Sequence, residues 1–140
     1  MRALILDDEP LVLSVLQRLL VHRGYDVVTY PDVASCPLFF GDRCPCSGTA
    51  KCPDVILADL NMPDVNGVQF VRKLQRKGCK CRNIAVMSGG WTAESLQQVS
   101  RLGVSIFAKP FHLQGLESWL GSAEGSIAGP PVQSIRELPI

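Results

Sequence analysis

Five polar side chains that could do chemistry each follow a short apolar run of the sequence. Asp7 and Asp8 follow one such run, and Asp59, Ser88 and Lys109 each end a later one. Three carboxylates held close together repel one another and raise each other's pKa unless a cation neutralises them. Oxygen ligands in a partly hydrated site favour Mg²⁺. If the fold gathers these residues, they form a site for an anion, most naturally a phosphoryl group.

Each residue type would have its own role in such a site. A divalent ion and the Lys109 ammonium would face the central carboxylate, Asp59, which could act as a nucleophile and form an acyl phosphate. The Ser88 hydroxyl could donate a hydrogen bond to a phosphoryl oxygen. The simpler interpretation is that Asp and Lys residues at strand ends are only solvated. Five polar residues at matching strand ends favour the site over that interpretation.

The elements that would position these residues alternate between strand and helix. Apolar or β-rich runs predict strands over residues 3–7, 25–30, 54–59, 84–88 and 104–109. Helical spacing and capping signals predict helices over 10–23, 32–40 (broken by Pro37), 67–77, 92–102 and 112–120. The alternation predicts an α/β fold with a parallel sheet and helices on both faces. Ligands of such sheets bind outside the carboxyl ends of the strands, where the five polar residues would meet.

Composition limits the class of protein. A length of 140 residues fits one domain, and 46% hydrophobic against 19% charged residues indicates a globular chain. A formal net charge of +1 argues against a nucleic-acid partner that binds through bulk positive charge. No apolar run reaches the ~18 residues of a membrane span, and the N-terminus does not resemble a signal peptide. We therefore expect a cytoplasmic protein without a membrane or nucleic-acid partner.

The motifs around the polar residues resemble those of the receiver domain of two-component response regulators, of the chemotaxis-regulator type. The similar segments are residues 4–10 (LILDDEP), 58–63 (ADLNMP), Gly67, 87–89 (MSG) and 109–111 (KPF). They span about residues 2–121, and their order and spacing are specific as a set. The resemblance implies a flavodoxin-like, doubly wound sheet of strand order 2-1-3-4-5. It places the receiver domain at residues 1–121 and leaves 122–140, rich in Pro, Gly and Ser, as a flexible tail.

The resemblance also implies roles for individual residues. A sensor histidine kinase or phosphotransfer protein would donate its phosphoryl group to Asp59. Asp8, Asp59 and the backbone carbonyl of Asn61 would hold Mg²⁺, with Asp7 acting mainly through water. Lys109 and Ser88 would sense the phosphoryl group.

Two departures from the family pattern concern the parts that would report phosphorylation. An aromatic residue three positions before the lysine changes its rotamer in the family, but here that position is Ile106. The following Phe107 is expected to face the other way and lie in the core. Gly89 and Gly90 predict a mobile turn after Ser88. Trp91 is either a cover near the site or a surface aromatic.

Six cysteines exceed what packing requires in a reducing compartment. They are Cys36, Cys44, Cys46, Cys52, Cys79 and Cys81. All except Cys36 lie in two loops that precede neighbouring strands, so these loops should meet at the amino-end edge of the sheet. The five thiols could bind a structural Zn²⁺ or an iron–sulfur cluster, remain reduced, or form disulfides.

The leading hypothesis is a phospho-accepting signalling module without an output domain in this chain, which signals through an unknown downstream protein. It would not be an enzyme beyond gaining and losing its own phosphoryl group. One alternative is a degenerate receiver that serves as a metal-stapled interaction scaffold. Another is an aspartyl-phosphate phosphatase of the haloacid-dehalogenase kind. That family has a second aspartate two positions after its nucleophile, where this chain has Asn61.

Overall fold

A computed structural model of the chain describes residues 1–41 and 52–128. Its strands are β1 (Arg2–Leu6), β2 (Asp26–Tyr30), β3 (Val55–Asp59), β4 (Asn83–Ser88) and β5 (Ser105–Ala108). Its helices are α1 (Pro10–His22), α2 (Gly67–Arg76), α3 (Ala93–Leu102) and α4 (Leu113–Ala128), with a short 3₁₀ helix, η1 (Pro37–Phe39). The chain divides into two units after Lys109, so α4 is described by itself.

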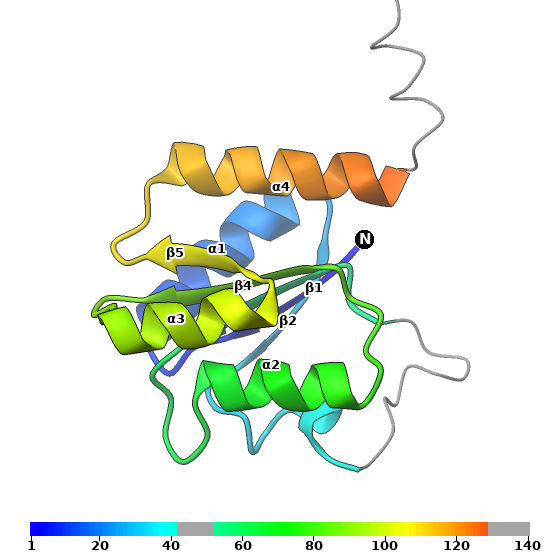
Figure 1. Cartoon of the computed structure of the whole chain (residues 1–140). Helices are drawn as coiled ribbons and strands as arrows, with labels where there is room; N and C mark the ends of the chain where they lie inside the picture. Colours follow the sequence, from blue (N-terminus) through cyan, green and yellow to red (C-terminus); the bar gives the residue numbers. More distant parts are fainter. Residues whose placement is uncertain (42–51, 129–140) are drawn as a thin grey trace, which may run out of the picture. The chain divides into compact units, whose positions relative to one another are not determined.

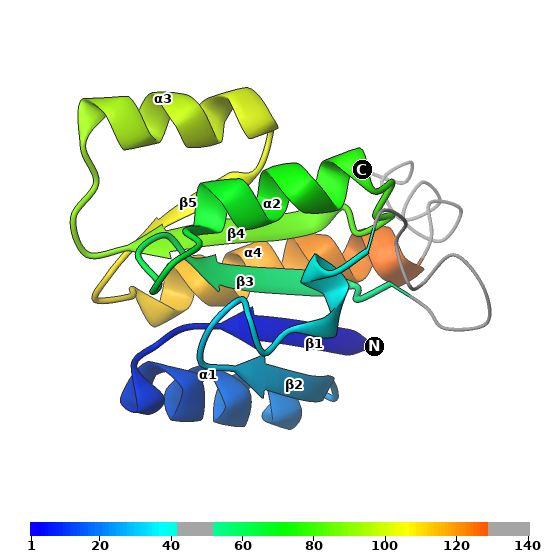
Figure 2. The same ribbon diagram turned by 90° about the horizontal axis from the view of Figure 1, so that it is seen from below.

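The five strands form one parallel sheet in the order β2-β1-β3-β4-β5. This is the doubly wound order that the sequence motifs implied. In the first unit, α1 lies on one face of the sheet and α2 and α3 lie on the other (Figures 1 and 2). The strand order reverses between β1 and β3, and a crevice for ligands forms at the carboxyl ends beside such a reversal.

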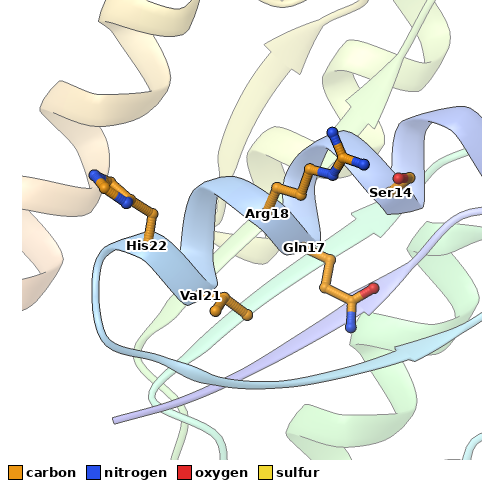
Figure 3. Close-up of a pocket in the computed structure, with 5 residues that line it drawn as sticks. All are labelled: Ser14, Gln17, Arg18, Val21 and His22. Atoms are coloured by element: carbon orange, nitrogen blue, oxygen red, sulfur yellow. The ribbon is translucent and has the colours of Figure 1, made fainter.

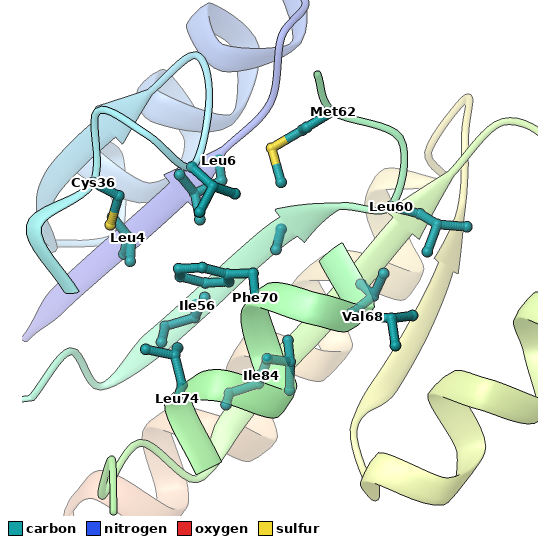
Figure 4. Packing of buried hydrophobic residues seen from close by; sticks show 14 of the residues in the cluster. Leu4, Leu6, Cys36, Ile56, Leu60, Met62, Val68, Phe70, Leu74 and Ile84 are labelled. Carbon is teal, nitrogen blue, oxygen red and sulfur yellow. The ribbon is translucent and has the colours of Figure 1, made fainter. Parts of the chain in front are cut away.

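The hydrophobic core between α2 and the sheet holds β1 and β3 in place through their buried side chains. Leu4 and Leu6 of β1 and Ile56 of β3 point toward Phe70 of α2 (Figure 4), and Phe70 is fully buried. Successive side chains alternate across a strand, so these even-numbered positions share one face. All five residues of β3 are buried, which places its last residue, Asp59, at a buried position on the carboxyl edge of the sheet.

Both helices on this face begin with a capping box, in which the side chain before the helix and the side chain three residues later bond to each other's backbone. Asn66 and Gln69 form this arrangement for α2. Thr92 and Ser95 form it for α3, which confirms the predicted N-cap at Thr92. The caps fix where each helix leaves the strand that precedes it.

The helix expected over 32–40 is wrong in extent, because only the 3₁₀ turn Pro37–Phe39 forms there. Proline lacks the N–H and prevents a regular helix from continuing through it. Tertiary contacts hold the turn instead. The Lys77 ammonium donates hydrogen bonds to the carbonyls of Leu38 and Phe40, and the Phe39 ring stacks on Phe70 with centroids 6.4 Å apart.

The last helix is longer than expected. It ends at Ala128 and not near residue 120, so residues 122–128, which composition assigned to the tail, are helical. Glycine lowers helix propensity by only about 1 kcal/mol, and the first strong helix breaker, Pro130, comes later. The rest of the expected tail lies outside the described residues. Within the described part of the chain, none of the helices is both long and apolar enough to cross a membrane.

Candidate functional site

The carboxyl ends of β1, β3, β4 and β5 bring the expected polar residues together. Lys109, directly after β5, places its Nζ atom 2.6 Å from Asp7 Oδ2 and 3.4 Å from Asp59 Oδ1. The Lys109 backbone N–H donates to the Ser88 carbonyl at 2.9 Å, which ties the end of β5 to the end of β4. Residues separated by up to about one hundred positions thus meet because parallel strands end at one edge.

Four acidic side chains form the centre of the site, and we call Asp7, Asp8, Glu9 and Asp59 the acidic group. One carboxylate oxygen from each lies within 4.8 Å of the others. Asp7 and Asp59 are buried, whereas Asp8 and Glu9 are exposed. The site therefore has a buried floor and a solvated rim, which suits a cation that keeps part of its water.

Glu9 was not among the residues expected in the site. Its Oε1 atom lies 3.2 Å from Lys109 Nζ, and its backbone N–H donates to Asp7 Oδ1 at 2.9 Å. The sequence signal was present, because Glu9 directly follows Asp7 and Asp8. What the sequence lacked was the turn that folds this carboxylate back toward Lys109.

One buried oxygen tests whether a cation fits. Asp7 Oδ2 is close enough to Lys109 Nζ for an ion pair, yet the angles do not make a hydrogen bond, and it has no other partner among the described residues. A buried carboxylate oxygen without a hydrogen bond is costly unless a further positive charge faces it. The donor set of carboxylates and this oxygen fit Mg²⁺.

Burial and neighbouring charges shift the pKa values of the two central groups. The pKa of Asp59 is raised to about 6, mainly because the side chain is buried and secondly because the Asp7 charge is near. The charge of Lys109 and the hydrogen bond from the Asn61 N–H lower this pKa, but by less. For Lys109, burial alone would lower the pKa, but the Asp7 and Asp59 carboxylates outweigh it and raise the pKa above the usual lysine value. At neutral pH the site therefore holds an ionised Asp59 beside a charged Lys109.

Ser88 is buried and oriented by two donors. Its hydroxyl oxygen accepts the Gly90 N–H at 3.0 Å and the Asn61 side-chain amide at 3.3 Å. The Asn61 backbone N–H donates to Asp59 Oδ1 at 3.4 Å, so Asn61 bridges the two functional groups. Because a hydroxyl carries two lone pairs and one hydrogen, the hydrogen of Ser88 can still be donated to an acceptor on Asp59.

Gly67 lets the turn after β3 close against Asp59. A Cβ atom at this position would lie 2.6 Å from the Asp59 carbonyl oxygen, a distance that real Cβ contacts do not show. The Gly67 N–H also donates to the Leu60 carbonyl at 2.9 Å. The absence of a side chain at position 67 therefore sets where Asp59 sits.

The cysteines lie apart from the acidic group, and only some of them can be placed. The Lys80 N–H donates to Cys52 Sγ at 3.4 Å, so the two expected loops do meet before β3 and β4. Burial above all raises the pKa of the nearby Cys81 to about 12. Cys36, Cys52, Cys79 and Cys81 are free thiols, and Cys44 and Cys46 lie outside the described residues. Among the described residues, no group of cysteines brings three ligand atoms within 4.8 Å, so the structure does not support zinc or an iron–sulfur cluster.

A shallow hollow on α1 is separate from the site. Ser14, Gln17, Arg18, Val21 and His22 line it (Figure 3). All five come from one helix, and no carboxylate or thiol is among them. The hollow therefore offers no acid–base pair or metal ligand set of its own beyond the single imidazole of His22.

Fold and acidic group together define a class: a doubly wound α/β domain with a charged site at the carboxyl ends of its strands. The model of the response regulator receiver domain family matches residues 3–120. The chain belongs to this family, as its motifs indicated. Receiver domains act in two-component signalling and bind Mg²⁺ at an acidic pocket, and the acidic group of this chain is compatible with that ion.

Curated relatives are longer than this chain. It is 31% identical to a protein-glutamate methylesterase/protein-glutamine glutaminase 2 of Dechloromonas aromatica, over 96% of the chain and 34% of the relative. It is 25% identical to the transcriptional regulatory protein KdpE of Mycobacterium tuberculosis, over 98% of the chain and 55% of the relative. The chain thus spans about a third to a half of these two proteins.

Solved structures share the fold. The receiver domain protein of Clostridium thermocellum superposes with a TM-score of 0.73 at 20% identity, covering 91% of this chain and 96% of that one. The chemotaxis protein CheY4 of Vibrio cholerae gives a TM-score of 0.68 at 24% identity, covering 87% and 97%. At such identities the likeness concerns the fold, and the site rests on the residues described above.

Proposed function

We propose that Asp59 accepts a phosphoryl group from the phosphohistidine of a sensor histidine kinase or a phosphotransfer protein. The observation that carries this proposal is a buried carboxylate with Lys109 Nζ at 3.4 Å, inside a group of four acidic side chains. A carboxylate is buried beside other carboxylates at a cost in stability, so a function has to account for the arrangement.

In the proposed reaction one side-chain oxygen of Asp59 attacks phosphorus. A P–O bond forms, the P–N bond of the phosphohistidine breaks, and the imidazole nitrogen keeps the electron pair and takes a proton from water. Lys109 places a fixed positive charge near the phosphoryl oxygens, and the Ser88 hydroxyl donates to one of them. Attack of water on the acyl phosphate later restores the Asp59 carboxylate and releases inorganic phosphate.

We propose that Asp7, Asp8, Asp59 and the backbone carbonyl of Asn61 hold the Mg²⁺ ion. When bound, the ion neutralises negative charge on the phosphoryl oxygens. The Asp7 Oδ2 atom, which lacks a hydrogen-bond partner among the described residues, supports this assignment. Glu9 on the rim competes for Lys109 and tunes how much of that charge faces Asp59.

We further propose that the chemistry of this chain is limited to gaining and losing its own phosphoryl group, in the cytoplasm, with output through a protein contact. Methylesterase and glutaminase activities are named for a relative of which this chain covers 34%, so they are not carried over. The family match to a signalling domain supports this limit.

The experiment is incubation with Mg²⁺ and acetyl phosphate, followed by intact-mass measurement. We expect the mass of one phosphoryl group on the wild type and none on Asp59→Ala. Asp26→Ala, which removes an exposed carboxylate of β2, serves as the matched control and should be modified like the wild type. A wild type that takes up no phosphoryl group would favour the interaction scaffold instead. Steady turnover of a general phosphatase substrate would favour the haloacid-dehalogenase alternative.

A thiol-bound structural metal at Cys44, Cys46, Cys52, Cys79 and Cys81 is kept as a separate proposal on one observation, the contact between Lys80 and Cys52. Metal analysis of protein purified without added metal tests it. Less than about half an equivalent of zinc or iron would remove the idea, because a structural site binds its metal tightly.

A further inference from the structure

The connection between β4 and α3 links the site to a tryptophan. Ser88 ends β4, and its hydroxyl accepts the Gly90 N–H at 3.0 Å. Trp91 comes next in the chain, and its indole Nε1 donates to the Phe107 carbonyl of β5 at 2.9 Å. Thr92, the N-cap of α3, follows immediately. The end of β4, the donor to Ser88, the indole bonded to β5 and the N-cap of α3 therefore all lie within residues 88–92.

Trp91 is a tether and not a free surface aromatic. Its ring is half-buried and packs against the core cluster between the sheet and its helices, as does Ile106 of β5. Together with the backbone bond from Lys109 to Ser88, the indole bond fastens this connection to β5 at a second point. The indole thus fixes the start of α3 relative to β5.

The turn between Ser88 and Trp91 has room to move. A Cβ atom at Gly90 would meet nothing within 4 Å, and one at Gly89 would meet only Lys109, at 3.9 Å. Glycine also permits backbone angles that other residues resist. The space around these two glycines leaves the turn able to change its backbone angles when Ser88 shifts.

We propose that Trp91 is a positioning residue that couples the hydrogen bonds of Ser88 to the placement of α3 against β5. This inference rests on the proposed function of Asp59. A phosphoryl group there offers new acceptor oxygens to the Ser88 hydroxyl. When the Ser88 side chain rotates toward these oxygens, its own oxygen moves away from the Gly90 N–H. The turn then shifts, and the bond from Trp91 to Phe107 opens. Phosphorylation then changes the surface formed by α3 and β5.

Fluorescence of Trp91 tests the first part. The chain has two tryptophans, so Trp119→Phe leaves Trp91 as the sole tryptophan, whose emission can be excited selectively over that of the tyrosines. With Mg²⁺ and acetyl phosphate we expect its emission to shift to longer wavelength as the indole gains water, in step with the phosphoryl mass in the same sample. Asp59→Ala in the same background should show no shift. A full phosphoryl mass with unchanged emission would overturn the coupling, whereas absence of the mass overturns the proposed function and this inference with it.

Hydrogen exchange tests the second part. Trp91→Phe keeps a ring in the core but removes the N–H that bonds to Phe107. We expect phosphoryl uptake to stay within about twofold of the wild type, because Trp91 touches none of the reacting groups. The phosphorylation-dependent change in exchange over α3 (Ala93–Leu102) should be lost. Trp119→Phe is the matched control and should retain the change. An undiminished change in Trp91→Phe would refute the role of the indole.

Discussion

Asp59 is held in an environment that disfavours its charge. It is 4% exposed and lies beside Asp7, and both effects oppose ionisation. Such a carboxylate weakens the folded state at neutral pH unless a cation binds, so its cost should be measurable as a function of pH.

We expect Asp59→Asn to raise the free energy of unfolding at pH 7 without Mg²⁺ by about 1–3 kcal/mol, since a shift of about two pKa units corresponds to roughly 3 kcal/mol at most. The pKa of Asp59 in the folded state, about 6, lies above the ordinary aspartate value of 3.8. The folded state therefore binds the extra proton between these values, and its stability falls as pH rises through that window. The extra free energy of unfolding of Asp59→Asn over the wild type should therefore mostly vanish near pH 4.

Urea unfolding of wild type and variant at both pH values provides the measurement. Asp26→Asn, on an exposed position of β2, is the control and should change stability little at either pH. An equal gain for Asp59→Asn at pH 4 and pH 7 would show that ionisation is not the cause.

At the scale of elements, the turn between β3 and α2 matters because it carries both Asp59 and Asn61. Its closure depends on Gly67, which approaches the Asp59 carbonyl more closely than any side chain permits. The sequence marked Gly67 only as part of a motif, and the close approach explains why glycine is required.

Gly67→Ala should therefore cost about 1–3 kcal/mol of stability, the usual range for overpacking against backbone that cannot yield easily. It should also slow phosphoryl uptake, because Asp59 must move. Thermal melting and the rate of uptake from acetyl phosphate give the two readouts. Gly115→Ala is the matched control: nothing lies within 4 Å of its added Cβ, and alanine favours helix α4 by about 0.5–1 kcal/mol. A Gly67→Ala variant as stable and active as the wild type would contradict this account of the turn.

In β5, the burial of the side chains differs from what the sequence predicted. Phe107 was expected in the core, but it is half-buried, and Ile106 packs against the core cluster. The alternation along β5 is as predicted, since Val86 pairs with Ile106 and Met87 with Phe107. How far each side chain is buried depends on its neighbours, and sequence alone did not show that Trp91 of the adjoining connection packs against the same core cluster as Ile106.

For the whole molecule, Mg²⁺ should bind the folded chain and stabilise it. At tenfold above its dissociation constant the gain is about 1.4 kcal/mol, which corresponds to a rise in melting temperature of about 3–6 °C. Asp8→Ala should lose most of the rise, because it removes a carboxylate of the acidic group. Asp26→Ala should retain it. Differential scanning calorimetry with and without Mg²⁺ gives the result, and an equal rise in both variants would place the ion elsewhere.

The sequence by itself determined the order of the elements and the edge at which the chemistry lies. Apolar runs, caps and breakers are local signals, and a parallel sheet must bring the ends of its strands to one side. That is why Asp7, Asp59, Ser88 and Lys109 were named in advance and are found together.

Only the tertiary structure decided how these residues act on one another. Three features depend on how deeply each side chain is buried and in which direction it points. They are the pairing of Glu9 with Lys109, the Asp7 oxygen that lacks a hydrogen bond among the described residues, and the raised pKa of Asp59. The same holds for the 3₁₀ turn Pro37–Phe39, which Lys77 holds from another element. Such features arise from contacts between residues far apart in the chain, and no local pattern of residue types encodes them.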